Sequence, residues 1–173
     1  MPAMAKLEPL QPDDHIDGPD DAELELVMYG DFQCPYCIAA HPIVGRVRER
    51  LAGRLRFVFR HFPIDDIHPL ARKAAEASEA AAAQGKFWEM YELLYASRGK
   101  LSRPELAGYA DQLGLDPVAF EAALESGEHA ERVQRDFESG EGSGISGTPA
   151  FFANGLRHDG SFDAGSLISA LEG

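Results

Sequence analysis

The pattern of apolar and polar positions predicts a strand, a helix and a second strand in the first third of the chain. An apolar-rich run over 23–30 is typical of a strand. Cys34 follows at the expected start of a helix, with Pro35 at the first helical position, where its missing N–H sacrifices no hydrogen bond. Gly53 ends this helix, and residues 56–60 alternate in the manner of a second strand. This succession predicts two parallel strands joined by a right-handed crossover.

The middle of the chain is predicted to be helical. An alanine-rich helix opens at His68-Pro69, and a capping box formed by Ser102 and Glu105 opens a later one. The glycines within 140–144 predict a flexible turn. We expect helices over about 68–85, 87–96, 102–114, 116–127 and 128–137.

The last part of the chain returns to strands. Residues 150–153 are predicted to form a strand, and Asn154-Gly155 is a strong signal for a hairpin that leads into a strand over 156–158. A final helix follows the cap at Asp163. The whole order predicts an α/β fold, in which a small mixed sheet carries an all-helical insertion after its second main strand.

This order also predicts the domain organisation. Residues 1–22 are rich in Pro, Asp and Gly, and we expect them to form an extended N-terminal leader. Residues 23–173 are expected to form a single domain, with the helical insertion at about 66–140.

Composition narrows the possible partners. A formal net charge of −13 argues against nucleic acid and anionic membranes as partners. No apolar stretch approaches the length that crosses a bilayer, so we expect no membrane insertion. The first residues lack the apolar core of a signal peptide, which favours a cytoplasmic location.

The two cysteines of the chain carry its most informative motif, Cys34-Pro35-Tyr36-Cys37. A C-x-x-C that closes a strand and opens a helix places its first thiol at the positive end of the helix dipole, where the thiolate is favoured. Cys34 is therefore predicted to be the attacking nucleophile, and Cys37, one turn further in, the resolving thiol. Pro35 and Tyr36 are expected to tune the pair.

Several segments together carry a resemblance to a known family. They are 29–37 (YGDFQCPYC), 60–63 (RHFP), 68–69 (HP), 84–90 (QGKFWEM) and 147–152 (GTPAFF). In these segments the chain resembles the DsbA-like branch of the thioredoxin superfamily, in particular the thioredoxin-4-type oxidoreductases. The first and last segments are specific in combination, and the resemblance extends from about residue 15 to the end of the chain.

The resemblance implies a thioredoxin fold and a protein thiol–disulfide oxidoreductase. It implies that Pro149 is cis and packs against the cysteines, and that the backbone of Thr148 pairs with an extended substrate. Substrates would be protein or peptide dithiols and disulfides, and a redox recycling partner is implied. We expect no bound metal and no cofactor besides the Cys34–Cys37 disulfide.

Three further residues are candidates for the site. Phe32 is expected in an apolar rim that faces the substrate. His61 either helps to hold the thiolate or is simply hydrogen-bonded at a strand end. Members of the superfamily often carry a buried acid six residues before the first cysteine, where this chain has Met28. Asp31 is the best-placed replacement by sequence, although it could equally be a solvated turn residue.

The sequence leaves two other functions and both directions of exchange open. Glutathione-dependent isomerases and kappa-type transferases share the architecture and act on small molecules, but they typically have a serine-centred site in place of the C-x-x-C. Alternatively, the two cysteines would hold zinc between two chains in a binding module, although zinc normally takes four ligands.

Overall fold

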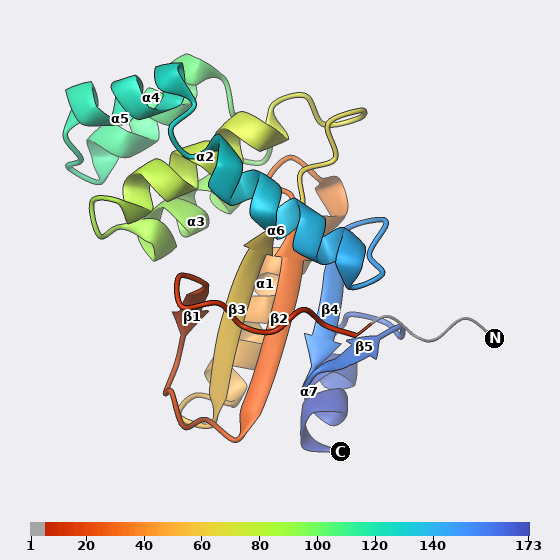
Figure 1. Cartoon of the computed structure of the whole chain (residues 1–173). Helices are drawn as coiled ribbons and strands as arrows, with labels where there is room; N and C mark the ends of the chain where they lie inside the picture. Colours follow the sequence, from red (N-terminus) through yellow and green to blue (C-terminus); the bar gives the residue numbers. More distant parts are fainter. Residues whose placement is uncertain (1–5) are drawn as a thin grey trace.

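In the computed structural model, which describes residues 6–173, five strands form one mixed sheet in the order β1-β3-β2-β4-β5 (Figure 1). The strands are β1 (His15–Asp17), β2 (Leu24–Gly30), β3 (Leu55–His61), β4 (Ala150–Ala153) and β5 (Leu156–His158). β2 and β3 run parallel and are joined by helix α1 (Pro35–Arg50), as predicted. β4 is antiparallel to β2 and β5 to β4, so the predicted hairpin is confirmed.

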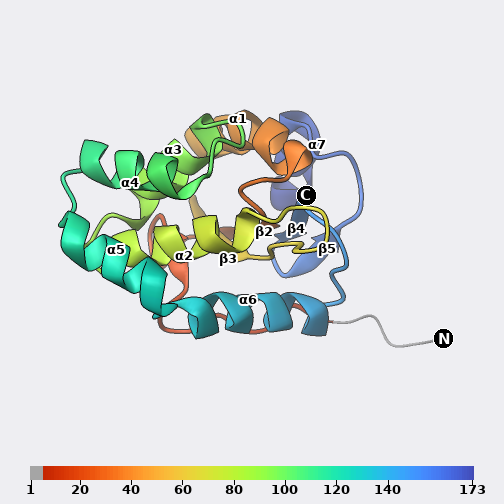
Figure 2. The same cartoon turned by 90° about the horizontal axis from the view of Figure 1, so that it is seen from above.

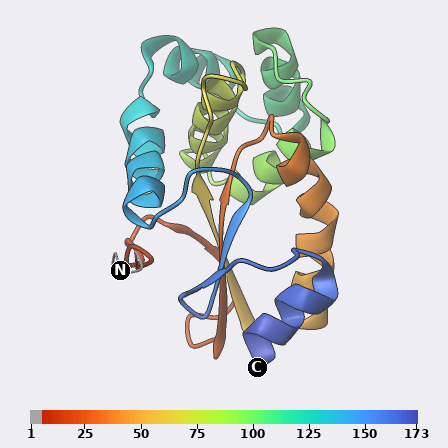
Figure 3. The ribbon, with the colours of Figure 1, turned by 90° about the vertical axis from the view of Figure 1, so that its right-hand side faces the viewer.

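Helices cover both faces of this sheet. α1 and α7 (Ala164–Glu172) lie on one face, and α6 (Ala130–Gly142) lies on the other, as the edge-on view shows (Figure 3). The remaining helices gather at the end of the sheet where β2 and β3 finish (Figures 1 and 2). They are α2 (Ala71–Ala82), α3 (Phe87–Ala96), α4 (Arg103–Gln112) and α5 (Pro117–Ser126). The expected α/β architecture with a helical insertion is thus confirmed.

The alternation of side chains along β2 divides the core between the two faces. Leu26 and Met28 point into the cluster beneath α1 and the insertion helices, whereas Val27 and Tyr29 belong to the cluster on the opposite face. All four are fully buried. A strand covered on both faces is apolar almost without interruption, which is the pattern that marked it in the sequence.

Local signals set the ends of several elements. The capping box between Ser102 and Glu105 is present at α4, and the Asp163 side chain accepts a hydrogen bond from the Ser166 amide at α7. In the β4–β5 hairpin, Asn154 and Gly155 have φ angles of 51° and 84°, the left-handed conformation that the tight turn needs.

The N-terminal segment differs from the expected extended leader. Residues 15–17 form β1, which pairs antiparallel with β3 at the edge of the sheet, and the chain before it crosses the sheet face (Figure 1). A strand of three residues between Pro-, Asp- and Gly-rich stretches shows no periodicity, so tertiary hydrogen bonds and not local pattern create it. Residues 1–5 of the expected leader lie outside the described part of the chain.

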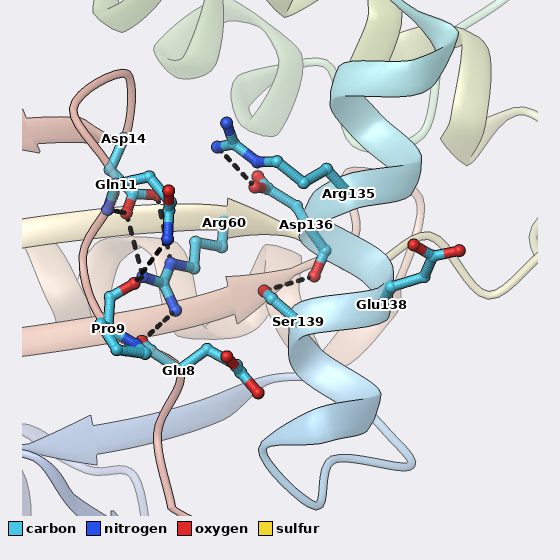
Figure 4. A pocket seen from close by; sticks show the side chains of 9 residues that line it. All are labelled: Glu8, Pro9, Gln11, Asp14, Arg60, Arg135, Asp136, Glu138 and Ser139. Atoms are coloured by element: carbon cyan, nitrogen blue, oxygen red, sulfur yellow. Dashed lines mark hydrogen bonds and ion pairs between the residues drawn. The ribbon is translucent and has the colours of Figure 1, made fainter.

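The buried Arg60 of β3 holds this crossing segment. Its guanidinium donates to both carboxylate oxygens of Asp14 at 3.1 and 2.9 Å and to the carbonyl oxygens of Glu8 and Pro9 at 3.0 and 2.9 Å (Figure 4). It also donates to the Tyr29 hydroxyl at 2.7 Å. A cavity of about 410 Å³ lies between this segment and α6. Because the guanidinium of Arg60 is hydrogen-bonded to other residues of the protein, we assign this arginine a structural role.

Helix α6 is longer than predicted, and the expected turn over 140–144 begins only after Gly142. Gly140 is buried against the sheet, where an added Cβ would lie 2.6 Å from the Phe62 ring and 3.1 Å from that of Tyr29. This glycine therefore permits close packing of a helix on two aromatic rings. The sequence prediction wrongly took it for a helix breaker.

Candidate active site

The two thiols lie at the N-terminus of α1, at the edge of the sheet where β2 ends. Cys34 is the N-cap residue, with φ −67° and ψ 122°, and Pro35 occupies the first turn as predicted. Cys34 is 3% exposed and Cys37 is fully buried, whereas Tyr36 between them is 67% exposed. Both cysteines are free, so the pair is in its reduced form. The first amides of the helix have no helical partner and face the Cys34 sulfur.

The surroundings make the two thiols chemically unequal. A hydrogen bond from the Cys37 thiol, opposed by burial and assisted by Thr148 and the backbone amides of Cys37 and Tyr36, lowers the pKa of Cys34 to about 5. Burial, followed by the adjacent Cys34, raises the pKa of Cys37 well above its ordinary value. At neutral pH this arrangement gives one thiolate and one thiol.

A loop from the far end of the chain completes the site. The peptide bond between Thr148 and Pro149 is cis, the form that the resemblance implies. The Cys34 thiol lies 3.7 Å from the carbonyl oxygen of Thr148, to which it donates when protonated. Within the described residues the buried Thr148 hydroxyl has no hydrogen-bond partner, so it is free to donate to Cys34 once that thiol ionises.

Asp31 is not a solvated turn residue, which corrects one of the two expectations for it. Its side chain is fully buried, and one carboxylate oxygen accepts from the backbone amides of Gln33 at 2.7 Å and Cys34 at 3.0 Å. The other oxygen accepts from the amide of Ile64 at 2.9 Å and from Nδ1 of His68 at 2.8 Å. Sequence reasoning missed the part played by His68, although its His-Pro pair belongs to the matching segments.

Two other candidates lie away from the thiols' immediate contacts. Phe32 is 1% exposed and packs against the rings of Phe59 and Tyr95, with centroids 5.3 and 4.8 Å away, so it belongs to the core and not to a substrate-facing rim. Its apolar ring turns inward because aromatic side chains surround it. His61 is buried and bonds the Glu79 carboxylate at 2.8 Å. Of the two roles expected for His61, the structure therefore shows the hydrogen-bonded residue at a strand end.

His61 also belongs to a group of three potential metal ligands. Nε2 of His15 and Nε2 of His61 lie 2.7 and 2.8 Å from the same oxygen of Glu79. Ligand atoms around a tetrahedral zinc lie roughly 3.3 Å apart, given metal–ligand bonds of about 2.0–2.1 Å. The observed spacings are those of hydrogen bonds, and we read the trio as a hydrogen-bonded cluster that ties β1 to β3 and α2.

An open groove of about 730 Å³ lies beside the thiols along α1. Gln33, Pro35, Ile38 and Pro42 line one side, and Tyr95 and Arg98 line the other. Its lining includes Gln33 and Pro35, the two neighbours of Cys34 in the sequence. Among the described residues, no helix combines the length and apolar character required to cross a bilayer.

Comparison with known proteins identifies a family and a fold for this chain. The family model described as Thioredoxin (Thioredoxin_4) matches residues 10–172. A solved thioredoxin-like oxidoreductase from Silicibacter pomeroyi DSS-3 is 25% identical, with a TM-score of 0.83 over 94% of this chain and 92% of that one. Oxidised BdbD from Bacillus subtilis is 21% identical, with a TM-score of 0.86 over 98% and 99% of the two chains.

A curated relative is more similar in sequence but much longer. The Na(+)/H(+) antiporter NhaA 1 of Salinispora arenicola (strain CNS-205) is 46% identical over 166 residues, which cover 94% of this chain and 25% of the relative. This chain thus spans about a quarter of that protein. The family model covers nearly the whole chain, and the fold agrees with it. The chain therefore belongs to the thioredoxin family that the model describes.

Proposed function

We propose that the protein exchanges disulfides with protein or peptide substrates through Cys34 and Cys37. The observation that supports this most directly is the inequality of the two thiols. Cys34 combines a lowered pKa with a position at a helix N-terminus beside Thr148, and Cys37 is buried behind it. Thiol–disulfide exchange needs such a pair, because one sulfur must attack and the other must release the product.

In the reducing direction, the Cys34 thiolate attacks one sulfur of a substrate disulfide, and the other substrate sulfur leaves as a thiolate that takes up a proton. Cys37 then loses its proton and attacks Cys34 in the mixed disulfide. The second substrate sulfur leaves, so that the substrate gains two electrons and two protons while the protein forms the Cys34–Cys37 disulfide. The oxidising direction is the reverse of these steps.

The surroundings of Cys34 favour an extended substrate chain. The backbone of Thr148 lies next to the attacking sulfur, where it can pair with a substrate strand. The groove along α1 extends this surface. A separate redox partner would restore the starting state of the pair, and the reduction potential of Cys34–Cys37 would decide whether the protein donates or removes disulfides.

Reduction of insulin, with dithiothreitol as the electron source, tests the proposal. We expect turnover by the wild-type protein and loss of turnover in Cys34→Ser. Equal turnover in both would overturn the proposal.

The same preparations separate the alternative functions. Binding of glutathione in a calorimetric titration without insulin reduction would favour a small-molecule isomerase or transferase. Stoichiometric zinc in elemental analysis would favour the metal-holding module.

A further inference from the structure

Asp31 contacts both halves of the thiol pair. Its carboxylate accepts the backbone N–H of Cys34 at 3.0 Å, and its own backbone amide is one of the groups that favour the Cys37 thiolate. A fully buried carboxylate this close to Cys34 carries a negative charge that opposes the formation of a second negative charge on the sulfur. A positive charge next to this carboxylate would offset that opposition.

His68 is placed to supply that compensation. Its Nδ1 lies 2.8 Å from the Asp31 oxygen that does not bond the Cys34 amide. The histidine side chain is 12% exposed, whereas that of Asp31 is fully buried. The imidazole of His68 thus reaches solvent, whereas the carboxylate that it contacts does not.

We propose that a protonated His68 forms an ion pair with Asp31 and thereby sets the fraction of Cys34 that is thiolate. His68 is a positioning residue in this account, because it acts on the sulfur through Asp31. With His68 neutral, only hydrogen bonds offset the charge of the carboxylate, and a smaller fraction of Cys34 is thiolate at a given pH. With His68 charged, the pair is neutral overall and the helix N-terminus acts on the sulfur unopposed. This inference deepens the proposed function, because it concerns the same nucleophile.

The other titratable groups around Asp31 and His68 are bonded to other side chains, exposed to solvent or held neutral by burial. On the His68 loop, Asp65 is paired with Arg72 of α2 at 3.1 Å, while Asp66 is exposed. On α3, Tyr95 is buried, and burial followed by the charges of Cys37, Tyr91, Asp31 and Cys34 raises its pKa, so it stays neutral. At the end of β3, His61 is bonded to Glu79. Among the described residues, His68 is therefore the basic side chain that directly contacts Asp31.

Titration of the thiolate absorbance near 240 nm in the reduced protein tests this role without requiring any exchange activity. His68→Gln can keep a hydrogen bond to Asp31 but loses the charge, and we expect it to raise the Cys34 midpoint by about 0.5–1 pH unit. His68→Lys restores a cation and should return the midpoint toward the wild-type value. The control His158→Gln, whose histidine bonds the Ser161 carbonyl on the distant β5 hairpin, should leave the midpoint unchanged.

A double-variant cycle tests whether His68 acts through Asp31. In an Asp31→Asn background, His68→Gln should produce no further shift. The inference would be overturned if His68→Gln left the Cys34 midpoint unchanged, or if His68→Lys shifted it as much as His68→Gln does. It would also be overturned if His68→Gln produced the same shift in the Asp31→Asn background as in the wild type. If Asp31→Asn does not fold, the Cys34 midpoints of His68→Gln and His68→Lys still show whether the charge at position 68 matters. If the midpoints shift as expected but the wild-type protein does not reduce insulin, the proposed function is contradicted and the role of His68 is not.

Discussion

The Cys34 thiol lies 3.7 Å from the carbonyl oxygen of Thr148, a residue 114 positions later in the chain. The helix start places the sulfur, and the loop before β4 places the carbonyl and the neighbouring hydroxyl. Neither segment builds the site alone, because the helix activates the sulfur while the loop offers backbone to an incoming chain. The antiparallel pairing of β2 with β4 brings the two together.

The pH dependence of alkylation follows from the unequal thiols. The rate at which iodoacetamide modifies Cys34 should rise with pH to a plateau, with a midpoint at about 5. Replacement of Cys37 by alanine removes the hydrogen bond that contributes most to the lowered pKa of Cys34, so this midpoint should rise. Mass spectrometry should find modification at Cys34 alone at pH 7, because Cys37 is buried with a raised pKa. A midpoint near 8.5, the value of an ordinary cysteine, would contradict this account.

Glu79 should stabilise the fold in a pH-dependent manner. Burial alone would raise the pKa of its carboxyl, but hydrogen bonds from His15 and His61 hold it well below the ordinary value. A group with a lowered pKa contributes stability above its unfolded pKa of about 4.3, and this contribution is lost as the pH falls below that value. We expect Glu79→Gln to lower the free energy of unfolding by about 1–3 kcal/mol at pH 7.

Urea denaturation at pH 7 and at about pH 3 measures this effect. The gap between wild type and Glu79→Gln should narrow at the lower pH. A gap that is constant over this range would show that the charge of Glu79 is irrelevant to its role.

Arg60 should hold the N-terminal segment in place. Lysine at this position cannot reproduce the two parallel hydrogen bonds to Asp14 or reach both carbonyl oxygens (Figure 4). We expect Arg60→Lys to destabilise the protein by about 2–4 kcal/mol and to expose residues 6–17 to limited proteolysis. Arg54→Lys, at an exposed ion pair with Glu23, is the matched control and should change stability little. Equal effects of the two variants would refute the structural role of Arg60.

Two glycines in helices should respond oppositely to alanine. At Gly140 in α6 the added methyl would lie 2.6 Å from the Phe62 ring, and we expect Gly140→Ala to cost about 1–3 kcal/mol of stability. Gly108 in α4 has open space around it, so Gly108→Ala should stabilise by about 0.5–1 kcal/mol. Thermal melts of both variants compare them, and a neutral Gly140→Ala would show that α6 can move away from the sheet.

Much of this molecule could be predicted from its sequence because its signals are local. The strand before Cys34, the helix after it and the Asn154-Gly155 turn each depend on neighbouring residues. The sequence predictions that were wrong concern residues whose structure depends on contacts with distant parts of the chain. β1 exists because Arg60 and β3 hold it, Gly140 is helical because two rings approach it, and Phe32 is buried because distant aromatic residues surround it. Of the four donors that converge on Asp31, the Ile64 amide and His68 come from a segment that only the fold brings near.

Trapping of the mixed disulfide tests the central claim most directly. Cys37→Ser leaves the attacking thiol intact but removes the one that resolves the intermediate. Incubated with insulin, this variant should accumulate a covalent complex that reductant dissolves and that mass spectrometry maps to Cys34. Cys34→Ser should form none. Accumulation of the complex in Cys34→Ser, or its absence in Cys37→Ser, would contradict the assignment of Cys34 as the nucleophile and Cys37 as the resolving thiol.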